Sequence, residues 1–187
     1  MIKAIDTPYR GHLFRSRLEA RWAVFFDALR IKWEYEPEGY DLGDGVKYLP
    51  DFYWTEENIY IEIKPSNFNI EYSPKDVEKY TRFGKYKTLL LIIGSPMANF
   101  PIMGDTRTHY IDYSVYMYGS NSCVGPFIFS TGRRNEYSLY LQKVDDLYGE
   151  FQIVDNDERE EKETMVASPL LTVAYQLASS QRFGVYE

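Results

Sequence analysis

The chain has 187 residues, of which 44% are hydrophobic, and its 28 acidic and 21 basic side chains give a formal net charge of -7. A chain of this length buries roughly two thirds of the surface that its unfolded form exposes, so we expect one domain over residues 1–187. The single cysteine excludes an intramolecular disulfide framework, and two histidines are too few for an all-protein zinc cluster. No window approaches roughly 18 uncharged apolar residues and the first residues lack an apolar signal core, so we expect a cytoplasmic protein with no membrane partner.

The acidic charge is concentrated in one stretch of the chain. Residues 145–163 hold nine acidic and two basic side chains, so the rest of the chain holds 19 of each and sums to zero. Residues 1–35 hold seven basic and four acidic side chains, a local excess of +3. This excess favours contact with a polyanion, and an arginine-rich, solvated helix face is the alternative that charge alone leaves open.

The periodicity of apolar residues predicts a helix followed by strands. Apolar residues recur at spacings of three and four over about 13–29, which indicates an amphipathic helix. Alternation around Trp33 predicts a strand, and a loop with a glycine turn at 43–45 follows. Segments 46–54 and 58–65 also alternate and are separated by a short turn, so we expect them to pair as a hairpin.

A second helix and a buried strand are expected to complete the core. Pro74, after Ser73, is typical of a helix start, and Gly84 is a common helix end. The uninterrupted apolar run at 88–94 is typical of a strand that is covered on both faces. The resulting order, helix, three strands, helix, strand, predicts an α/β fold over about 12–94, with a mixed central sheet flanked by helices.

The rest of the chain is expected to extend this sheet. Short runs rich in tyrosine and phenylalanine predict further antiparallel strands over about 95–150. The acidic stretch at 145–163 is expected to be an exposed loop. Ser168, as the cap, and Pro169 then predict a closing helix over about 168–183.

The predicted hairpin carries the residues with chemical potential. Side chains two apart in a strand share a face, so Glu62 and Lys64 lie side by side, opposite the isoleucines of their strand. The hairpin brings Asp51, which follows Pro50, to the same edge of the sheet. Two carboxylates suit a hard cation such as Mg²⁺, and a nearby lysine can orient or deprotonate a water for attack on phosphorus. The arrangement predicts metal-assisted phosphodiester hydrolysis.

These residues resemble the PD-(D/E)xK nuclease superfamily, because Pro50 and Asp51 are followed, ten residues later, by Glu62, Ile63 and Lys64. The predicted order of elements also resembles the αβββαβ core of restriction-endonuclease-like proteins. An ill-characterised group of phage and prophage proteins that carry this core is similar in the segments RSRLEARWAVFFDALRIKWEYEPE, YLPDF, IEIKP and SSQRF.

The resemblance implies a cofactor and a set of site residues. It implies that Asp51, Glu62 and the Ile63 carbonyl bind Mg²⁺, for which Mn²⁺ can substitute, and that Lys64 positions the attacking water. A glutamate on the first helix commonly joins such a site, and Glu19 is the matching residue. The resemblance covers the predicted core and, loosely, the closing helix, and the region between them has no counterpart.

Each candidate has a structural alternative. Glu19 can close a capping box with Ser16 or form an i,i+4 ion pair with Arg15. The glutamate and lysine of the hairpin can form a surface ion pair of little energetic weight, and the aspartate can be a turn residue.

The basic first helix supplies the candidate DNA contacts. Arg15, Arg17 and Arg21 are expected to bind phosphates, and a solvated helix face is the alternative. We expect His12 and His109 to be ordinary surface or core histidines. Tyr48, Trp54 and Tyr60 are expected to pack in the sheet.

The expected function is that of a Mg²⁺-dependent DNA endonuclease of phage or mobile-element origin, acting in the host cytoplasm if phage-encoded. A branched-DNA resolvase or a transposition-type nicking subunit is the alternative among enzymes. A nucleic-acid-binding or anti-defence phage protein without catalysis is the alternative from another class. The enzyme is favoured because a binding module has no need of clustered carboxylates, which repel phosphates. DNA is the expected partner, and a homodimer is left open.

Overall fold

A computed structural model gives the fold of the chain. It describes the backbone of residues 4–99, 110–119, 127–132, 135–144, 151–153 and 169–184, and the side chains of residues 4–97, 113–119 and 170–184. The predictions made for His109, for Ser168 and for most of the acidic stretch at 145–163 lie outside the described residues. Across the described ranges, no helix combines the length and the apolar character needed to cross a membrane.

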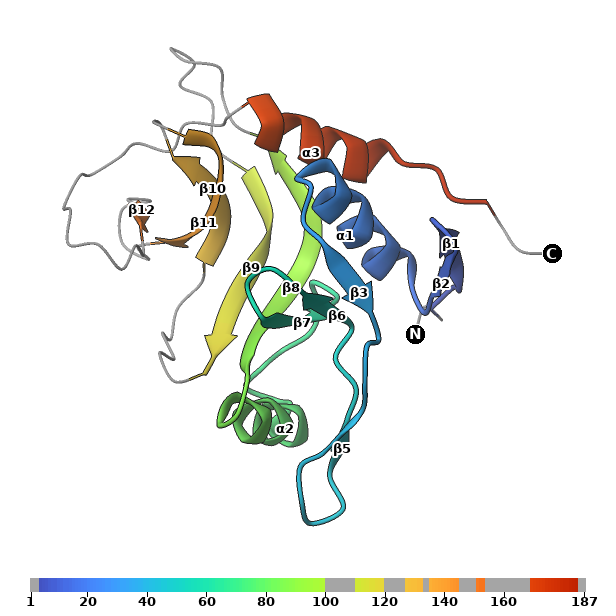
Figure 1. The fold of residues 1–187 in the computed structure, drawn as a ribbon, viewed down its shortest axis with the longest axis vertical. Helices are drawn as coiled ribbons and strands as arrows, with labels where there is room; N and C mark the ends of the chain where they lie inside the picture. Colours follow the sequence, from blue (N-terminus) through green and yellow to red (C-terminus); the bar gives the residue numbers. More distant parts are fainter. Residues whose placement is uncertain are drawn as a thin grey trace.

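A mixed β-sheet forms the centre of the molecule (Figure 1). Its strands follow the order β12-β11-β10-β9-β8-β7-β6-β3. The five strands of its central part are β3 (Trp33–Tyr35), β6 (Phe52–Trp54), β7 (Ile59–Lys64), β8 (Thr88–Asn99) and β9 (Tyr110–Tyr118). β7 and β8 are parallel, whereas the other neighbouring strands pair antiparallel. The mixed sheet is therefore confirmed, and so is the predicted hairpin over Phe52–Trp54 and Ile59–Lys64. Lys47 and Tyr48, which were predicted to belong to the same strand of that hairpin, pair instead with Asp41 and Tyr40 in a separate sheet.

Three more strands extend one side of the sheet. They are β10 (Phe127–Gly132), β11 (Asn135–Val144) and β12 (Phe151–Ile153), and they pair antiparallel, as expected for this region. β12 lies inside the acidic stretch, so the loop expected there is interrupted by a strand.

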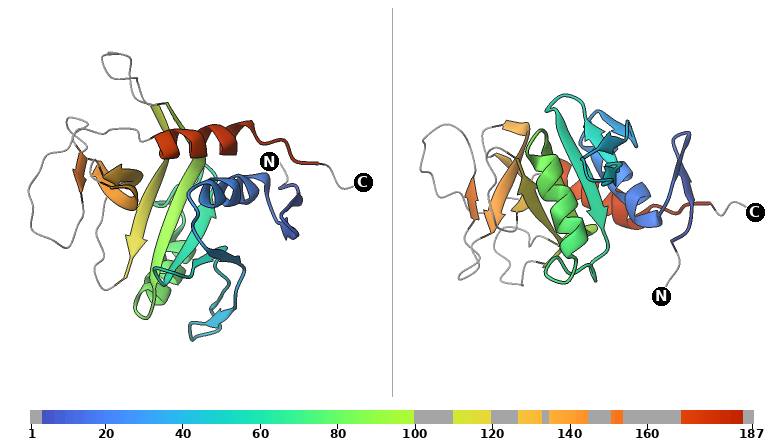
Figure 2. Two further views of the ribbon diagram at one scale, coloured as in Figure 1. Left: turned by 45° about the horizontal axis from the view of Figure 1, so that its top comes forward. Right: turned by 90° about the horizontal axis from the view of Figure 1, so that it is seen from below.

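Helices cover both faces of the sheet. α1 (Arg17–Ala28) and α3 (Pro169–Ser180) lie on one face, and α2 (Pro74–Gly84) lies on the other, as the two further views in Figure 2 show. The first core contains buried residues of α1 and α3 packed on the odd-numbered isoleucines of β7. The second contains the aromatic residues of α2 packed on the opposite face of the same strand and of β8.

β8 shows why an uninterrupted apolar run needs two cores. Leu89 and Leu91 belong to the α2 core, and Leu90 and Ile92 belong to the core under α1 and α3; all four are fully buried. The strand continues to Asn99, beyond the end expected near Gly94. Gly94 has a φ of 111°, and the pairing with β9 shifts register after it, so this glycine marks an irregularity within the strand.

The first helix starts later than its apolar pattern predicts. Residues His12–Phe14 form strand β2, which pairs with β1 (Thr7–Tyr9) in a separate two-stranded sheet. Phe14 is fully buried, and so it continues the apolar pattern of the helix although it lies in a strand. Ser16 is the N-cap of α1, and its side chain accepts a hydrogen bond from the amide of Glu19.

The loop predicted after β3 contains a small ribbon. β4 (Tyr40–Asp41) and β5 (Lys47–Tyr48) pair antiparallel and project from the sheet beside α2 (Figure 1). The turn between them has positive φ angles at Gly43 and Gly45, which glycine adopts without strain. Arg82 of α2 binds the Asp44 carboxylate at 2.9 Å and thereby ties this turn to the helix.

Candidate active site

Residues from three parts of the fold line one pocket of about 400 Å³. Asp51 comes from the approach to β6, Glu62 and Lys64 come from β7, and Glu19 comes from the first turn of α1. The remaining lining residues are Ala4, Arg15, Lys47, Tyr48, Leu49, Ile63 and Lys79. The pocket thus gathers all four residues predicted to be catalytic.

The hairpin register explains how Asp51 reaches Glu62. Phe52 faces Ile61 across the antiparallel pair, so the next position places Asp51 opposite Glu62. The Asp51 side chain is 4% exposed, and its Oδ2 accepts a hydrogen bond of 2.7 Å from the amide of Ile63. The carboxylate is therefore oriented by the backbone of the strand that carries its partner.

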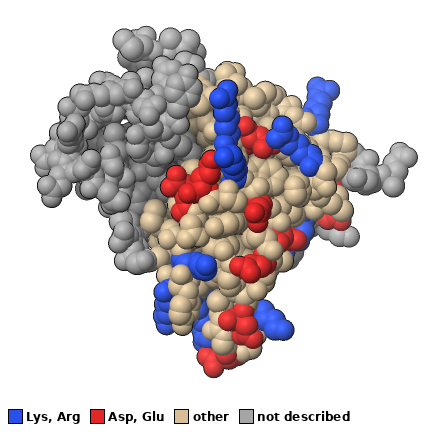
Figure 3. Space-filling model, viewed as in Figure 1, with Lys and Arg blue, Asp and Glu red and all other residues tan. Residues whose placement is uncertain are grey.

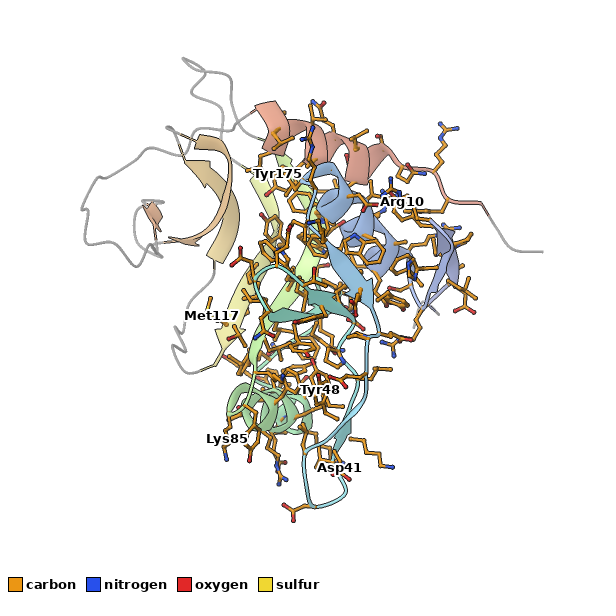
Figure 4. All side chains as sticks on the ribbon, in the orientation of Figure 1. Arg10, Asp41, Tyr48, Lys85, Met117 and Tyr175 are labelled. Atoms are coloured by element: carbon orange, nitrogen blue, oxygen red, sulfur yellow. The ribbon has the colours of Figure 1, made fainter. Side chains whose placement is uncertain are left out.

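Glu62 is held by residues of the α2 side of the sheet. Its side chain is 4% exposed, and Lys64 Nζ lies 2.7 Å from its Oε1. Tyr48 Oη donates to its Oε2 at 2.9 Å, and Tyr80 Oη donates to its Oε1 at 3.4 Å. Tyr48, labelled in Figure 4, belongs to β5 of the ribbon, and its ring contacts those of Tyr80 and Phe83 in α2. The ribbon and the helix thus both fix the position of this carboxylate.

Glu19 serves the helix cap and lines the pocket at once. Its Oε1 accepts a hydrogen bond of 2.6 Å from Ser16 Oγ, and its Oε2 accepts one of 2.6 Å from Tyr35 Oη. The N-cap half of the predicted capping box is therefore confirmed, because Ser16 Oγ accepts from the Glu19 amide, whereas the Glu19 carboxylate accepts from the Ser16 hydroxyl and not from its backbone amide. The ion pair expected between Arg15 and Glu19 is not formed, because Arg15 turns to other carboxylates.

The three candidate DNA-binding arginines separate in the structure. Arg15 lies at the pocket, where its Nη2 is 2.6 Å from Asp51 Oδ1. Arg21 instead donates to the carbonyls of Ala178 and Ser179 at 2.6 and 2.8 Å, at the end of α3. Arg17 is exposed and does not line the pocket. The structure brings only Arg15 to the site, since the C-terminal end of a helix attracts a cation such as Arg21.

The charges of the pocket perturb each other. Burial raises the pKa of Asp51 well above its usual range, the charges of Glu62 and Glu19 act in the same direction, and the Ile63 amide and Lys64 oppose them. Burial alone lowers the pKa of Lys64, but the adjacent Glu62 outweighs it, so the net pKa is raised. The Lys64 ammonium beside Glu62 is therefore a hydrogen-bond donor to that carboxylate.

Tyr48, Tyr80 and Lys79 lie near the site, although no sequence pattern predicts them there. Burial and the Glu62 charge raise the pKa values of Tyr48 and Tyr80, so both phenols remain donors to that carboxylate. Lys79 Nζ lies 5.4 and 5.1 Å from the two ring centroids and 2.8 Å from Asp76 Oδ1. Tyr48 was expected to pack in the sheet. Its role depends on the ribbon, which no local pattern predicts.

The carboxylates suit a hard cation by their chemistry. In the part of the chain that the structure describes, no group of three or more His, Cys, Asp or Glu side chains is already gathered to hold a metal ion. Mg²⁺ needs fewer protein ligands, because one or two carboxylates, waters and substrate phosphates usually complete its shell. Asp51 and Glu62 fit that description, but Arg15 and Lys64 now contact the oxygens that a cation would use.

The surface around the site is mixed in charge. Figure 3 shows acidic and basic side chains interspersed on the face seen there, without a separate basic patch. No protein-family model, no curated protein and no solved structure matches the chain. The choice of a function therefore depends on the residues of the pocket.

Proposed function

We propose that the chain is a Mg²⁺-dependent DNA endonuclease of the PD-(D/E)xK type, built on a restriction-endonuclease-like core. The observation that carries this proposal is the convergence of Asp51, Glu62 and Lys64 on one pocket from two neighbouring strands. Asp51 and Glu62 are each 4% exposed, and burial of two charged carboxylates lowers the stability of a fold. A purely structural role explains neither why the two carboxylates lie close together nor why they line a pocket.

The proposed metal ligands are oxygens. Asp51 and Glu62 would hold Mg²⁺ or Mn²⁺ together with the Ile63 carbonyl, and Glu19 would complete or orient the shell. When bound, the cation would neutralise the carboxylates, polarise a phosphate oxygen and lower the pKa of a water. The raised pKa of Asp51 supports this assignment, because a carboxylate crowded by like charges gains most from a cation.

Lys64 acts as a positioning donor in this proposal. Its ammonium points at Glu62 Oε1 from the same strand face, so it can donate to an attacking water or to a phosphate oxygen. In the reaction a water oxygen would form a bond to phosphorus, one P–O ester bond would break, and one proton of the water would end on the departing sugar oxygen, which leaves as a hydroxyl. The fixed ammonium stabilises the negative charge that develops on the phosphate oxygens during this exchange.

The rim of the pocket supports a polyanionic substrate. Arg15, Lys47 and Lys79 line the pocket beside the carboxylates, so a phosphodiester meets cations on its way to the buried acids. A branched-DNA resolvase and a nicking subunit would use the same residues and remain within this proposal. A non-catalytic DNA-binding protein is disfavoured, because the buried carboxylates repel phosphates unless a metal intervenes.

Cleavage of supercoiled plasmid tests this proposal. Nicking is expected with Mg²⁺ or Mn²⁺ and not with Ca²⁺, and Lys64→Ala is expected to lower the rate by about 10²-fold or more. Lys85→Ala is the matched control, because Lys85 is an exposed lysine on the outer side of α2 (Figure 4). Undiminished nicking by Lys64→Ala, purified in parallel with the control, would contradict the proposed mechanism.

A further inference from the structure

Arg15 occupies the oxygen of Asp51 that the proposed metal needs. Asp51 Oδ2 is engaged by the Ile63 amide at 2.7 Å, and that bond belongs to the backbone of β7. Asp51 Oδ1 receives Arg15 Nη2 at 2.6 Å. The carboxylate oxygen that is free of the backbone thus carries a guanidinium.

The Arg15 side chain is built to move while its backbone is held. Its backbone amide donates to Tyr35 Oη at 3.0 Å, immediately before the N-cap of α1. The Arg15 side chain is 55% exposed, whereas the side chain of Lys64, which pairs with the neighbouring carboxylate of Glu62, is 25% exposed. Arg15 also has a second carboxylate partner, because its Nε lies 2.7 Å from Glu36 Oε1 in an ion pair. Release from Asp51 therefore requires no change in a helix or strand.

We propose that Arg15 is the resident counter-ion of the site, which a divalent cation displaces from Asp51 and which then binds the phosphate of the substrate. This inference rests on the proposed function. A guanidinium and a divalent cation on one carboxylate oxygen repel each other, so binding of the cation favours release of the arginine. A released guanidinium matches the geometry of phosphate oxygens, and Glu36 keeps it at the rim of the pocket.

The exchange couples the two ligands of the site. Without DNA, Arg15 competes with the cation and lowers its affinity. With DNA, the guanidinium is bound to phosphate and no longer competes, so DNA raises the affinity for the cation. Because coupling between two ligands is reciprocal, the cation raises the affinity for DNA by the same factor. Through Arg15, binding of the cation then raises the affinity for DNA, and binding of DNA raises the affinity for the cation.

Calorimetric titration with Ca²⁺ measures this coupling without cleavage as the readout. The titration is done with and without a short DNA duplex. Wild type is expected to bind Ca²⁺ about fivefold or more tightly when the duplex is present, the lower end of usual coupling factors. Arg15→Gln is expected to bind Ca²⁺ more tightly than wild type without DNA, and to lose most of the gain with DNA.

Two further variants sharpen the result. Arg10→Gln is the matched control, because Arg10 is a 66% exposed arginine that pairs with Asp27, outside the pocket, and its Ca²⁺ affinity is expected to equal that of wild type. Glu36→Gln removes the negative charge that competes with Asp51 for Arg15, so it should strengthen the hold on Asp51 and weaken Ca²⁺ binding. This opposite change keeps the test decisive if Arg15→Gln does not fold.

The outcomes separate this inference from the proposed function. If Asp51→Asn abolishes Ca²⁺ binding while Arg15→Gln and Glu36→Gln leave both the affinity and its response to DNA unchanged, the counter-ion role is overturned and the metal site stands. If Asp51→Asn binds Ca²⁺ as wild type does, the proposed function itself is overturned. Tighter binding by Arg15→Gln together with loss of its DNA response supports the inference.

Discussion

Asp27 and Asp51 are both aspartates bound by an exposed arginine, but their surroundings differ. Asp27 accepts hydrogen bonds from Tyr9 Oη at 2.8 Å and Trp33 Nε1 at 3.1 Å, and Arg10 lies 3.2 Å from its Oδ1. Burial and the bond to Asp27 raise the pKa of Tyr9 to about 12, so this phenol remains a donor. Asp27 therefore ties α1 to β1 and β3 with two neutral donors and one cation.

Asp51 instead lies among other carboxylates. The charges of Glu62 and Glu19 add to the effect of burial on its pKa, and the pocket opens beside it. The comparison teaches that an acid with an arginine partner is not by itself a site. What distinguishes Asp51 is that like charges are held together where a substrate or cation can reach them.

The largest expected difference between the two aspartates is in cleavage. Asp51→Asn is expected to lower plasmid nicking by about 10²-fold or more, because it removes a charged metal ligand. Asp27→Asn keeps an acceptor for one of the two donors Tyr9 and Trp33, lies outside the pocket, and is expected to retain activity when it is assayed below its melting temperature. Comparable losses of cleavage in the two folded variants would remove the distinction.

Glu19 extends the comparison to a residue with two roles. Glu19→Gln keeps a side chain that accepts from Ser16 or Tyr35 but removes the charge. If Glu19 serves the metal, activity falls by about 10²-fold while the melting temperature changes little. The measurement is the initial nicking rate together with a melting curve, and wild-type turnover would leave Glu19 with the cap alone.

The two aspartates should also differ in their effect on stability without metal. The raised pKa of Asp51 means that its neutral form favours folding, and this contribution is lost as pH rises through the folded-state pKa. Asp51→Asn should therefore melt at or above wild type at neutral pH, and its advantage should shrink towards the ordinary aspartate pKa near about 4. Asp27→Asn should lose about 1 kcal/mol. Denaturation across a pH series measures the stability of both variants. If Asp51→Asn is less stable than wild type at neutral pH, the idea that Asp51 is destabilised by neighbouring carboxylates is contradicted.

The smallest expected effect concerns the ribbon. Tyr48→Phe removes the donor to Glu62 Oε2 and is expected to lower metal affinity by about 10-fold, as for other groups that orient a ligand. Tyr53→Phe is the matched control, because its hydroxyl donates to Asn58 at the exposed hairpin turn. Calorimetric Mn²⁺ titration distinguishes a positioning role from a purely structural one, which would change the melting temperature and leave the metal affinity as it is.

The parts of the fold that follow from local patterns were predictable. Strict alternation in β7 assigns Glu62 and Lys64 to one face and the isoleucines to the other, and the short turn before it implies the hairpin that carries Asp51. The apolar run of β8 likewise implies cover on both faces. These features depend on neighbours within a few residues, so the sequence alone contains them.

Other contacts depend on segments that are far apart. Arg15 contacts Asp51 and Glu36 together, and these two carboxylates are brought close by the pairing of β3 with β6. Arg21 contacts the end of α3, which is more than a hundred residues away in the sequence. Tyr48 reaches Glu62 from a ribbon in which it pairs with Tyr40, whereas the alternation of 46–54 predicts that it belongs to the hairpin strand. Long polar side chains have several acceptors within reach, so periodicity does not decide which of them a folded chain selects.

Calorimetric melting of wild type and Asp51→Asn across a Mn²⁺ titration tests the central claim most directly. Mn²⁺ at about a hundred times its dissociation constant should stabilise wild type by roughly 2.7 kcal/mol, which is on the order of 5 to 10 °C for a chain of this size. Asp51→Asn should show a much smaller rise, and Asp27→Asn should show the wild-type rise from a lower starting point. Acidic residues at 145–163 can bind cations loosely, so the difference between variants carries the test. Equal Mn²⁺ stabilisation of wild type and Asp51→Asn would place the ion elsewhere and contradict the proposed nuclease site.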